Sequence, residues 1–156
     1  MCLLLGVALV SCEKPPVYDR EAQLKLDVDS IARFVAANNI AATNDGSGLY
    51  SQILTAGSGN DTLKAMDLVT VVYTGRLLDG LVVERATEPD SVLYSSLIEG
   101  LSRGLKKIQS GGRIRLIIPS TMAYTNKVVG AIPANSNLDY TIELIKVTKY
   151  KIPTTK

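Results

Sequence analysis

The chain has 156 residues, of which 46% are hydrophobic and 21% charged, which is the size and composition of one globular domain. It contains no His, which excludes a Ser-His-Asp triad, a Cys-His couple and a His-ligated zinc site. The two Cys form no CxxC pair, so we also exclude thiol redox chemistry and expect neither a metal nor a cofactor. The net charge of +2 is too small to indicate nucleic-acid binding. Any catalysis therefore relies little on side-chain acids and bases.

The first twelve residues have the pattern of an export signal. An apolar run over residues 3–10 lies between Cys2 and Cys12; it has the length of a signal-peptide core and is too short to span a bilayer. It ends in Leu9-Val10-Ser11-Cys12, which resembles the bacterial lipobox, where a peptidase cuts before a lipidated Cys. We therefore expect residues 1–11 to be a lipoprotein signal peptide and Cys12 to be lipidated. A buried N-terminal strand or short core helix is the alternative.

One feature departs from that signal, because no Lys or Arg precedes the apolar run. A start codon assigned too far downstream would explain this. Cleavage before Cys12 would leave one Cys and hence no internal disulfide. The acyl chains of a lipoprotein are sufficient for stable anchoring. We expect a lipid-anchored protein of the bacterial cell envelope, at the outer membrane and facing the periplasm, with the membrane as a partner.

We predict a tether over residues 12–24 and an N-terminal extension, a helix and a strand, over residues 25–62. The tether is polar and contains two prolines. In the extension, Asp27 or Asp29 is predicted to cap a helix that ends at Asn38-Asn39. A turn over 45–48, a strand over 49–55 and a flexible joint over 57–61 are expected to follow.

From residue 63 to 149 the pattern predicts one α+β domain, followed by a tail over 150–156. Residues 68–73 and 81–83 are predicted to be strands that flank a hairpin turn at Asp79-Gly80. Ser96 and Glu99 fit a capping box for a helix that stops at Ser110-Gly111-Gly112. The expected remainder is a strand over 113–118, a loop over 120–137 and a strand over 138–144. We expect an antiparallel sheet of about five strands curved around one short helix, preceded by the N-terminal helix.

An ordered set of motifs in this domain resembles the FKBP-type peptidyl-prolyl isomerases. The motifs are Val71-Val72-Tyr73-Thr74-Gly75-Arg76-Leu77-Leu78-Asp79-Gly80, Leu97-Ile98-Glu99-Gly100-Leu101, Gly104-Leu105, Gly111-Gly112-Arg113, Ile118-Pro119, Ala123-Tyr124, Gly130-Ala131-Ile132-Pro133 and Leu138 to Val147. They cover about residues 63–147. The lipobox and the N-terminal helix are similar to the lipoprotein members of Bacteroidetes-type bacteria.

The resemblance implies a pocket and assigns its residues by matching positions. Tyr73, Glu84 and Tyr124 match catalytic positions, and Glu84 is expected to accept a hydrogen bond from Tyr73. The backbone N–H groups of Ile98 and Ile132 match ligand-gripping positions. The substrate-binding set implied by the family is Val83, Val92, Leu97, Ile98, Leu101, Ile132 and Tyr140.

Several of these positions depart from the family pattern. Val83-Glu84 replaces a Phe-Asp pair, Val92 replaces a Phe, and Leu101 replaces the Trp of the pocket floor. Tyr140 stands where Phe is usual, Thr125 where Gly is usual, and Ala134 replaces the second Pro of the loop. Each change from aromatic to aliphatic removes a flat wall from the proline site.

The implied function is a folding helper that isomerises X–Pro bonds of exported proteins, with proline-containing proteins or peptides as partners. An apolar, dry pocket that fits the twisted amide can lower the barrier without a nucleophile, metal or proton relay. This chemistry agrees with a chain that lacks His. The alternative is a catalytically weak or inactive FKBP-fold module that binds protein segments as a chaperone of the cell envelope.

Overall fold

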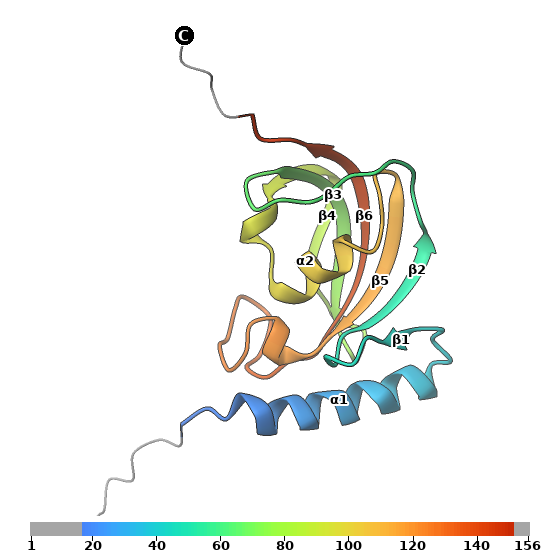
Figure 1. Ribbon diagram of the computed structural model, residues 1–156. Helices are drawn as coiled ribbons and strands as arrows, with labels where there is room; N and C mark the ends of the chain where they lie inside the picture. Colours follow the sequence, from blue (N-terminus) through green and yellow to red (C-terminus); the bar gives the residue numbers. More distant parts are fainter. Residues whose placement is uncertain (1–16, 152–156) are drawn as a thin grey trace, which may run out of the picture.

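The computed structural model describes residues 17–151 (Figure 1). The predicted signal peptide, the Cys12 lipidation site and the last part of the predicted tail lie outside these residues. Within residues 17–151, no helix is both long and apolar enough to cross a membrane.

The N-terminal helix α1 spans Arg20–Ala37 and begins earlier than the sequence predicts. Its N-cap is Asp19, whose carboxylate accepts hydrogen bonds from the N–H groups of Glu21 and Ala22 at 3.0 Å each. The predicted cap at Asp27 or Asp29 is therefore wrong, and the predicted tether ends before residue 24. The first half of α1 is mainly polar and exposed, so it lacks the apolar period that marks the second half. The predicted end is confirmed, since Asn38 is the C-cap.

Six antiparallel strands form one sheet in the order β1-β2-β5-β6-β3-β4. Their bounds are β1 Thr43–Asn44, β2 Tyr50–Thr55, β3 Leu68–Leu77, β4 Val82–Leu93, β5 Gly112–Ile118 and β6 Leu138–Thr148. The sheet curves around the short helix α2, Glu99–Leu105 (Figure 1). The α+β fold class is thus confirmed, with a two-residue edge strand in addition to the roughly five strands expected.

Helix α2 packs closely on the concave face because two of its residues lack a Cβ. A Cβ on Gly100 would lie 2.3 Å from Cγ2 of Ile118, and one on Gly104 would lie 2.2 Å from Cδ1 of Leu116. Only glycine allows this approach of helix to strand. The main core between α2 and the sheet includes Leu105, Ile114, Leu116, Ile118, Leu138, Tyr140, Ile142 and Leu144.

Two local predictions in this region are wrong. The N-cap of α2 is Ile98, and Ser96 Oγ donates to the carbonyl of Leu93 at 2.7 Å instead of forming a capping box. The predicted joint over 57–61 is tied to the turn after α2, since Ser110 Oγ donates to Asp61 at 2.8 Å. By contrast, the hairpin at Asp79-Gly80 is confirmed, with Gly80 at a φ of 94°.

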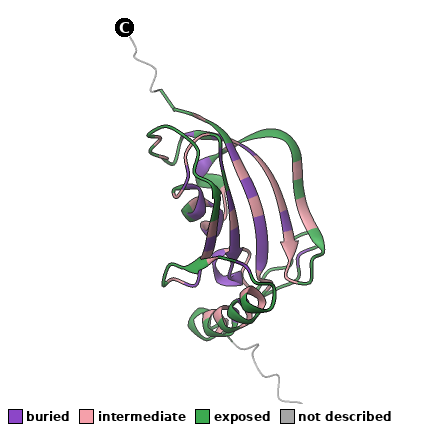
Figure 2. Ribbon diagram, turned by 90° about the vertical axis from the view of Figure 1, so that its right-hand side faces the viewer, coloured by how far each residue is buried: buried purple, intermediate pink, exposed green. Residues whose placement is uncertain are grey.

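Helix α1 packs against one end of the sheet through a second, smaller core. Ile31 of α1, Ile40 and Ile117 of β5 form its buried centre, and Phe34 packs against them. In Figure 2 buried residues line the strands that face α2, whereas much of α1 is exposed. α1 also contacts the short 3-10 turn η2, Ser120–Met122, at the start of the long loop.

Candidate functional site

The concave face of the sheet contains a cavity of about 210 Å³ beside the start of α2. β3 and β4 form one wall and the long loop contributes another. Its lining is Val71, Tyr73, Glu84, Val92, Ser96, Leu97, Ile98, Leu101, Tyr124 and Ile142. Seven residues of this lining belong to the predicted site, so the structure brings most of that set together.

The strand register places two of the predicted residues on either side of a glycine. Glu84 of β4 lies opposite Gly75 of β3, which lies opposite Tyr140 of β6. A Cβ on Gly75 would approach Cζ of Tyr140 to 2.6 Å. The missing side chain therefore lets the Tyr140 ring cross β3 and reach Glu84 on the next strand.

Glu84 is held by two phenols, and neither is the one predicted. Tyr124 Oη donates to Oε1 of Glu84 at 2.7 Å, and Tyr140 Oη donates to Oε2. The expected hydrogen bond from Tyr73 is thus replaced, because the Tyr140 hydroxyl, absent from the usual Phe, occupies the carboxylate. Tyr73 instead lies beside Tyr140, with ring centroids 6.1 Å apart and planes tilted by 43°.

Burial and the Glu84 charge keep all three phenols neutral. Burial raises the pKa of Tyr140 and of Tyr124, and the hydrogen bond to the Glu84 carboxylate raises each further. Burial, with the charges of Glu84 and Asp90, also raises the pKa of Tyr73. The site therefore offers hydrogen-bond donors and an apolar surface, and it contains no general base among these tyrosines.

The floor and walls of the cavity are aliphatic where the family has aromatic rings. Leu101, on the first turn of α2, is 7% exposed and forms part of the lining. Val92 lines the cavity from β4, and Val83 packs against the same core. With these smaller side chains the site is bounded by two tyrosines, Tyr73 and Tyr124, and by branched aliphatic groups.

The two predicted backbone donors differ in availability. The N–H of Ile132 donates to the carbonyl of Val129 at 2.9 Å, within a tight turn of the long loop, so it would have to leave that bond to hold a ligand. Its side chain is buried in the main core. The N–H of Ile98 precedes the first turn of α2 and makes no hydrogen bond within residues 17–151. Ile98 is therefore the available donor beside the cavity.

Thr125 holds a left-handed backbone conformation where the family has Gly, with a φ of 56°. Its hydroxyl donates to the carbonyl of Tyr124 at 2.7 Å, and its N–H donates to the carbonyl of Ser120 at 2.9 Å. These bonds fix the turn that presents Tyr124 to the cavity. A β-branched residue is strained in this conformation.

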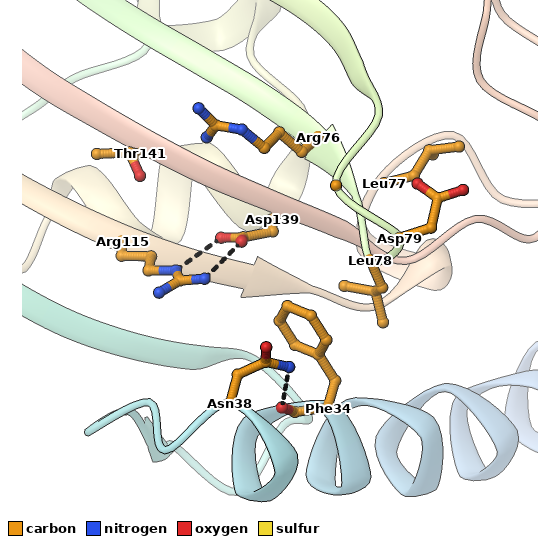
Figure 3. A pocket seen from close by; sticks show the side chains of 10 residues that line it. Phe34, Asn38, Arg76, Leu77, Leu78, Asp79, Arg115, Asp139 and Thr141 are labelled. Carbon is orange, nitrogen blue, oxygen red and sulfur yellow. Dashed lines mark hydrogen bonds and ion pairs between the residues drawn. The ribbon is translucent and has the colours of Figure 1, made fainter.

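A second cavity, of about 430 Å³, lies where α1 meets the convex face (Figure 3). Figure 3 shows Arg115 joined to Asp139 by two hydrogen bonds, at 2.9 and 2.7 Å, and Asn38 joined to the carbonyl of Phe34 at 2.9 Å. Its polar groups thus largely satisfy one another. We place the candidate site in the concave cavity, where donors and apolar walls converge.

The fold and this site define an α+β domain with an apolar, donor-lined cavity on the concave face of its sheet, and comparison with known families assigns this domain. FKBP-type peptidyl-prolyl cis-trans isomerase is the family that matches residues 59–145. The chain belongs to the FKBP-type peptidyl-prolyl cis-trans isomerase family.

Particular relatives share this domain. FKBP-type peptidyl-prolyl cis-trans isomerase FkpA of Escherichia coli (strain K12) is 40% identical over 103 residues, which are 64% of this chain and 38% of that protein. A probable FKBP-type peptidyl-prolyl cis-trans isomerase of Haemophilus influenzae is 33% identical over 144 residues, 89% of this chain and 58% of that protein. The chain thus spans less than two thirds of the length of these curated relatives.

Two solved structures are similar over most of the chain. The crystal structure of E. coli FkpA has a TM-score of 0.67 at 32% identity and covers 83% of this chain and 64% of that chain. A peptidyl-prolyl cis-trans isomerase of Pseudomonas syringae has a TM-score of 0.67 at 30% identity and covers 86% of this chain and all of that chain, 100%.

Three residues of the lining were missed by sequence reasoning: Val71, Ser96 and Ile142. Val71 and Ile142 lie two positions from Tyr73 and Tyr140, so strand alternation places them on the same face and could have identified them. Strand alternation could not identify Ser96, because this residue lies in a short 3-10 turn and not in a strand. The sequence pattern instead assigned it to a capping box. The role of Gly75 was also missed, since it depends on a neighbouring strand.

Proposed function

We propose that this protein is a peptidyl-prolyl cis-trans isomerase that helps exported proteins fold. The observation that carries the proposal is the concave cavity, in which apolar walls enclose two neutral phenols and the Ile98 N–H. Family membership supports the same activity. The aliphatic floor at Leu101 points to a slower enzyme than one with an aromatic floor.

The proposed mechanism uses desolvation and shape instead of proton transfer. An X–Pro amide must lose its conjugation to rotate, which sets a barrier of about 18–20 kcal/mol. Water favours the polar, planar amide, so an apolar pocket that accepts the twisted form lowers the barrier. The proline ring would lie against Tyr73 and Leu101, and the Ile98 N–H would hold a substrate carbonyl. Glu84 fixes the position of Tyr124 through the hydrogen bond at 2.7 Å.

We also propose that the chain is a lipoprotein of the cell envelope, anchored through Cys12 at the outer membrane and facing the periplasm, as in Bacteroidetes-type members. The support is the Leu9-Val10-Ser11-Cys12 motif. Replacing Cys12 by Ser is expected to release the protein into the soluble fraction of cells. Membrane association unchanged by that substitution would contradict the anchor.

The isomerase proposal is tested by proline-limited refolding of a model protein in the presence of the purified chain. We expect wild type to accelerate the slow phase at micromolar concentration. The double variant Leu101→Trp/Val83→Phe should be faster, because it restores aromatic walls. The matched control is Leu26→Trp, which adds an indole at a 66% exposed position on α1 and should match wild type.

Three outcomes are informative. Acceleration by wild type that increases in the double variant supports the isomerase. A folded double variant that is no faster than wild type would refute our account of the pocket. Binding of an unfolded client without any acceleration would favour the alternative, an FKBP-fold binding and chaperone module.

A further inference from the structure

The segment Ser120–Tyr124 is held at both ends by a carboxylate from another element. At its C-terminal end, Tyr124 donates to Glu84 of β4 at 2.7 Å. At its N-terminal end, Ser120 Oγ donates to Oδ2 of Asp27 in α1, also at 2.7 Å. Only the first of these contacts belongs to the cavity described above. The second connects the cavity's loop to the N-terminal helix.

Asp27 is an interior residue of α1 and is only 2% exposed. Its Oδ2 also accepts from the N–H of Thr121 at 3.4 Å, and its Oδ1 accepts from Nε2 of Gln23 at 2.8 Å. All three donors are neutral groups. A buried carboxylate is costly unless its oxygens are hydrogen-bonded, so moving any of these donors away from Asp27 would cost free energy. The contact therefore selects one position of η2 on α1.

Ser120 transmits that position to the tyrosine through its backbone. Its carbonyl accepts the N–H of Ala123 at 3.0 Å and of Thr125 at 2.9 Å. Its own N–H donates to Oδ1 of Asn137 at 3.0 Å. Tyr124 thus lies between two residues whose N–H groups are bonded to Ser120. A shift of Ser120 on α1 would move the turn that carries the Tyr124 ring.

We propose that Asp27 is a positioning residue for Tyr124, and that α1 is part of the working isomerase unit. The matched family region begins at residue 59, after α1, so it assigns no such role to this helix. The inference rests on the proposed function for its kinetic readout, but the contact itself can be tested without activity. Figure 1 shows α1 running beside the loop that begins at η2.

The kinetic test compares four variants of the full chain in a peptide isomerisation assay. Asp27→Ala and Ser120→Ala each break the contact from one side and should lower kcat/KM about tenfold, mainly through kcat, because a misplacement near 1 Å is costly for a positioned group. Asp27→Asn keeps an acceptor oxygen for Ser120 and should restore most of the rate. The matched control is Asp29→Ala, which removes an exposed ion pair to Arg33 on the same helix and should match wild type.

Two further measurements separate positioning from general destabilisation. The double variant Asp27→Ala/Ser120→Ala should be no slower than Asp27→Ala alone, since the two groups act as one contact. Amide hydrogen exchange should accelerate at Ala123 and Thr125 in both single variants while the amides of β5 and β6 remain protected. This readout is independent of catalysis.

The outcomes distinguish this inference from the proposed function. Suppose that wild type shows no isomerase activity, but that amide exchange at Ala123 and Thr125 is faster in Asp27→Ala and Ser120→Ala than in wild type. The proposed function then fails and the positioning contact is supported. If wild type is active and Asp27→Ala keeps full kcat/KM with unchanged exchange, the positioning role is refuted. Equal loss of rate in Asp27→Asn and Asp27→Ala would also refute it, because the acceptor oxygen would then be irrelevant.

Discussion

The two ends of Ser120–Tyr124 are anchored by carboxylates in different surroundings. Glu84 is half-buried beside an open cavity and is bonded to the phenols of Tyr124 and Tyr140. Asp27 is fully buried in a helix and is bonded to a hydroxyl, an amide and a backbone N–H. A ligand in the cavity can contact the first anchor directly. The second is closed to ligand and fixes the position from which the loop extends.

This difference indicates how the pocket can tolerate its altered walls. At the Tyr124 end of the segment, aliphatic groups such as Leu101 replace the aromatic groups of the family, and the Tyr140 hydroxyl is an additional donor to Glu84. At the Ser120 end, Asp27 contributes no wall of the cavity and only fixes the position of the loop. We therefore expect changes at Glu84 to affect stability and catalysis together, whereas breaking the Arg115–Asp139 pair, which contacts neither anchor, should affect stability alone.

The largest effect is expected from Glu84→Ala, which leaves the hydroxyls of Tyr124 and the buried Tyr140 without their acceptor. The free energy of unfolding should fall by about 3 kcal/mol, because two partly buried hydroxyl groups lose the charged carboxylate to which they donate. Urea unfolding measures this change. Glu84→Gln is the matched control and should cost less than half as much. Equal stability of Glu84→Ala and wild type would contradict the tyrosine–carboxylate network.

A smaller effect is expected at the convex face from Arg115→Ala. Asp139, whose side chain is 8% exposed, would lose both N–H donors of Arg115. The free energy of unfolding should fall by about 2 kcal/mol, less than for a fully buried pair because water reaches Arg115. Isomerase kcat/KM should stay unchanged. Arg113→Ala, at an exposed position on β5, is the control for loss of an arginine. A loss of activity in Arg115→Ala but not in Arg113→Ala would contradict the prediction, because it would show that the convex face influences the concave cavity.

High pH should destabilise the cavity end. The folded protein raises the pKa of Tyr140 above its ordinary value of 10.0, so the neutral phenol is favoured in the folded state. That contribution is complete below pH 10 and is lost as pH rises, because the unfolded chain ionises first. The expected loss from Tyr140 is about 1.4 kcal/mol per pH unit once the pH is well above 10. Urea unfolding of Tyr140→Phe should show a shallower decline of stability with pH, because the buried ionisable phenol is removed. Identical pH profiles of the variant and wild type would exclude Tyr140 as the source of the decline.

The smallest effect is expected from Thr125→Asn. Asn tolerates the left-handed conformation at a φ of 56° better than a β-branched residue. The free energy of unfolding should rise by about 0.5 kcal/mol, since the lost hydroxyl bond to Tyr124 offsets part of the relief. Thermal unfolding measures the shift. A drop in stability would show that the hydroxyl bond outweighs the strain.

The sequence was sufficient wherever the determining signal is local. Asp79-Gly80 predicted the hairpin because Gly favours the positive φ that the turn requires. Alternation over residues 138–144 predicted β6, and Pro119 correctly ended β5. The ordered motifs then placed Tyr73, Leu101 and Tyr124 around one cavity.

The contacts between distant elements could not be predicted in this way. The Asp27–Ser120 bond joins residues 93 apart in sequence, and a lone Asp in a polar stretch resembles a helix cap. The choice of Tyr140 over Tyr73 as a donor to Glu84 depends on the register across β3 and on the space left by Gly75. Such register is a property of the assembled sheet.

In the proposed function, the concave cavity both binds an X–Pro segment and rotates its peptide bond. Exchange NMR of a short proline peptide, recorded with a sub-stoichiometric amount of the full chain, tests both parts in one sample. We predict cis–trans exchange peaks of the peptide, together with amide shifts of the protein confined to the surroundings of Tyr73, Ile98 and Leu101. Shifts at those residues without any exchange peaks would contradict catalysis, and exchange with shifts elsewhere would contradict the site.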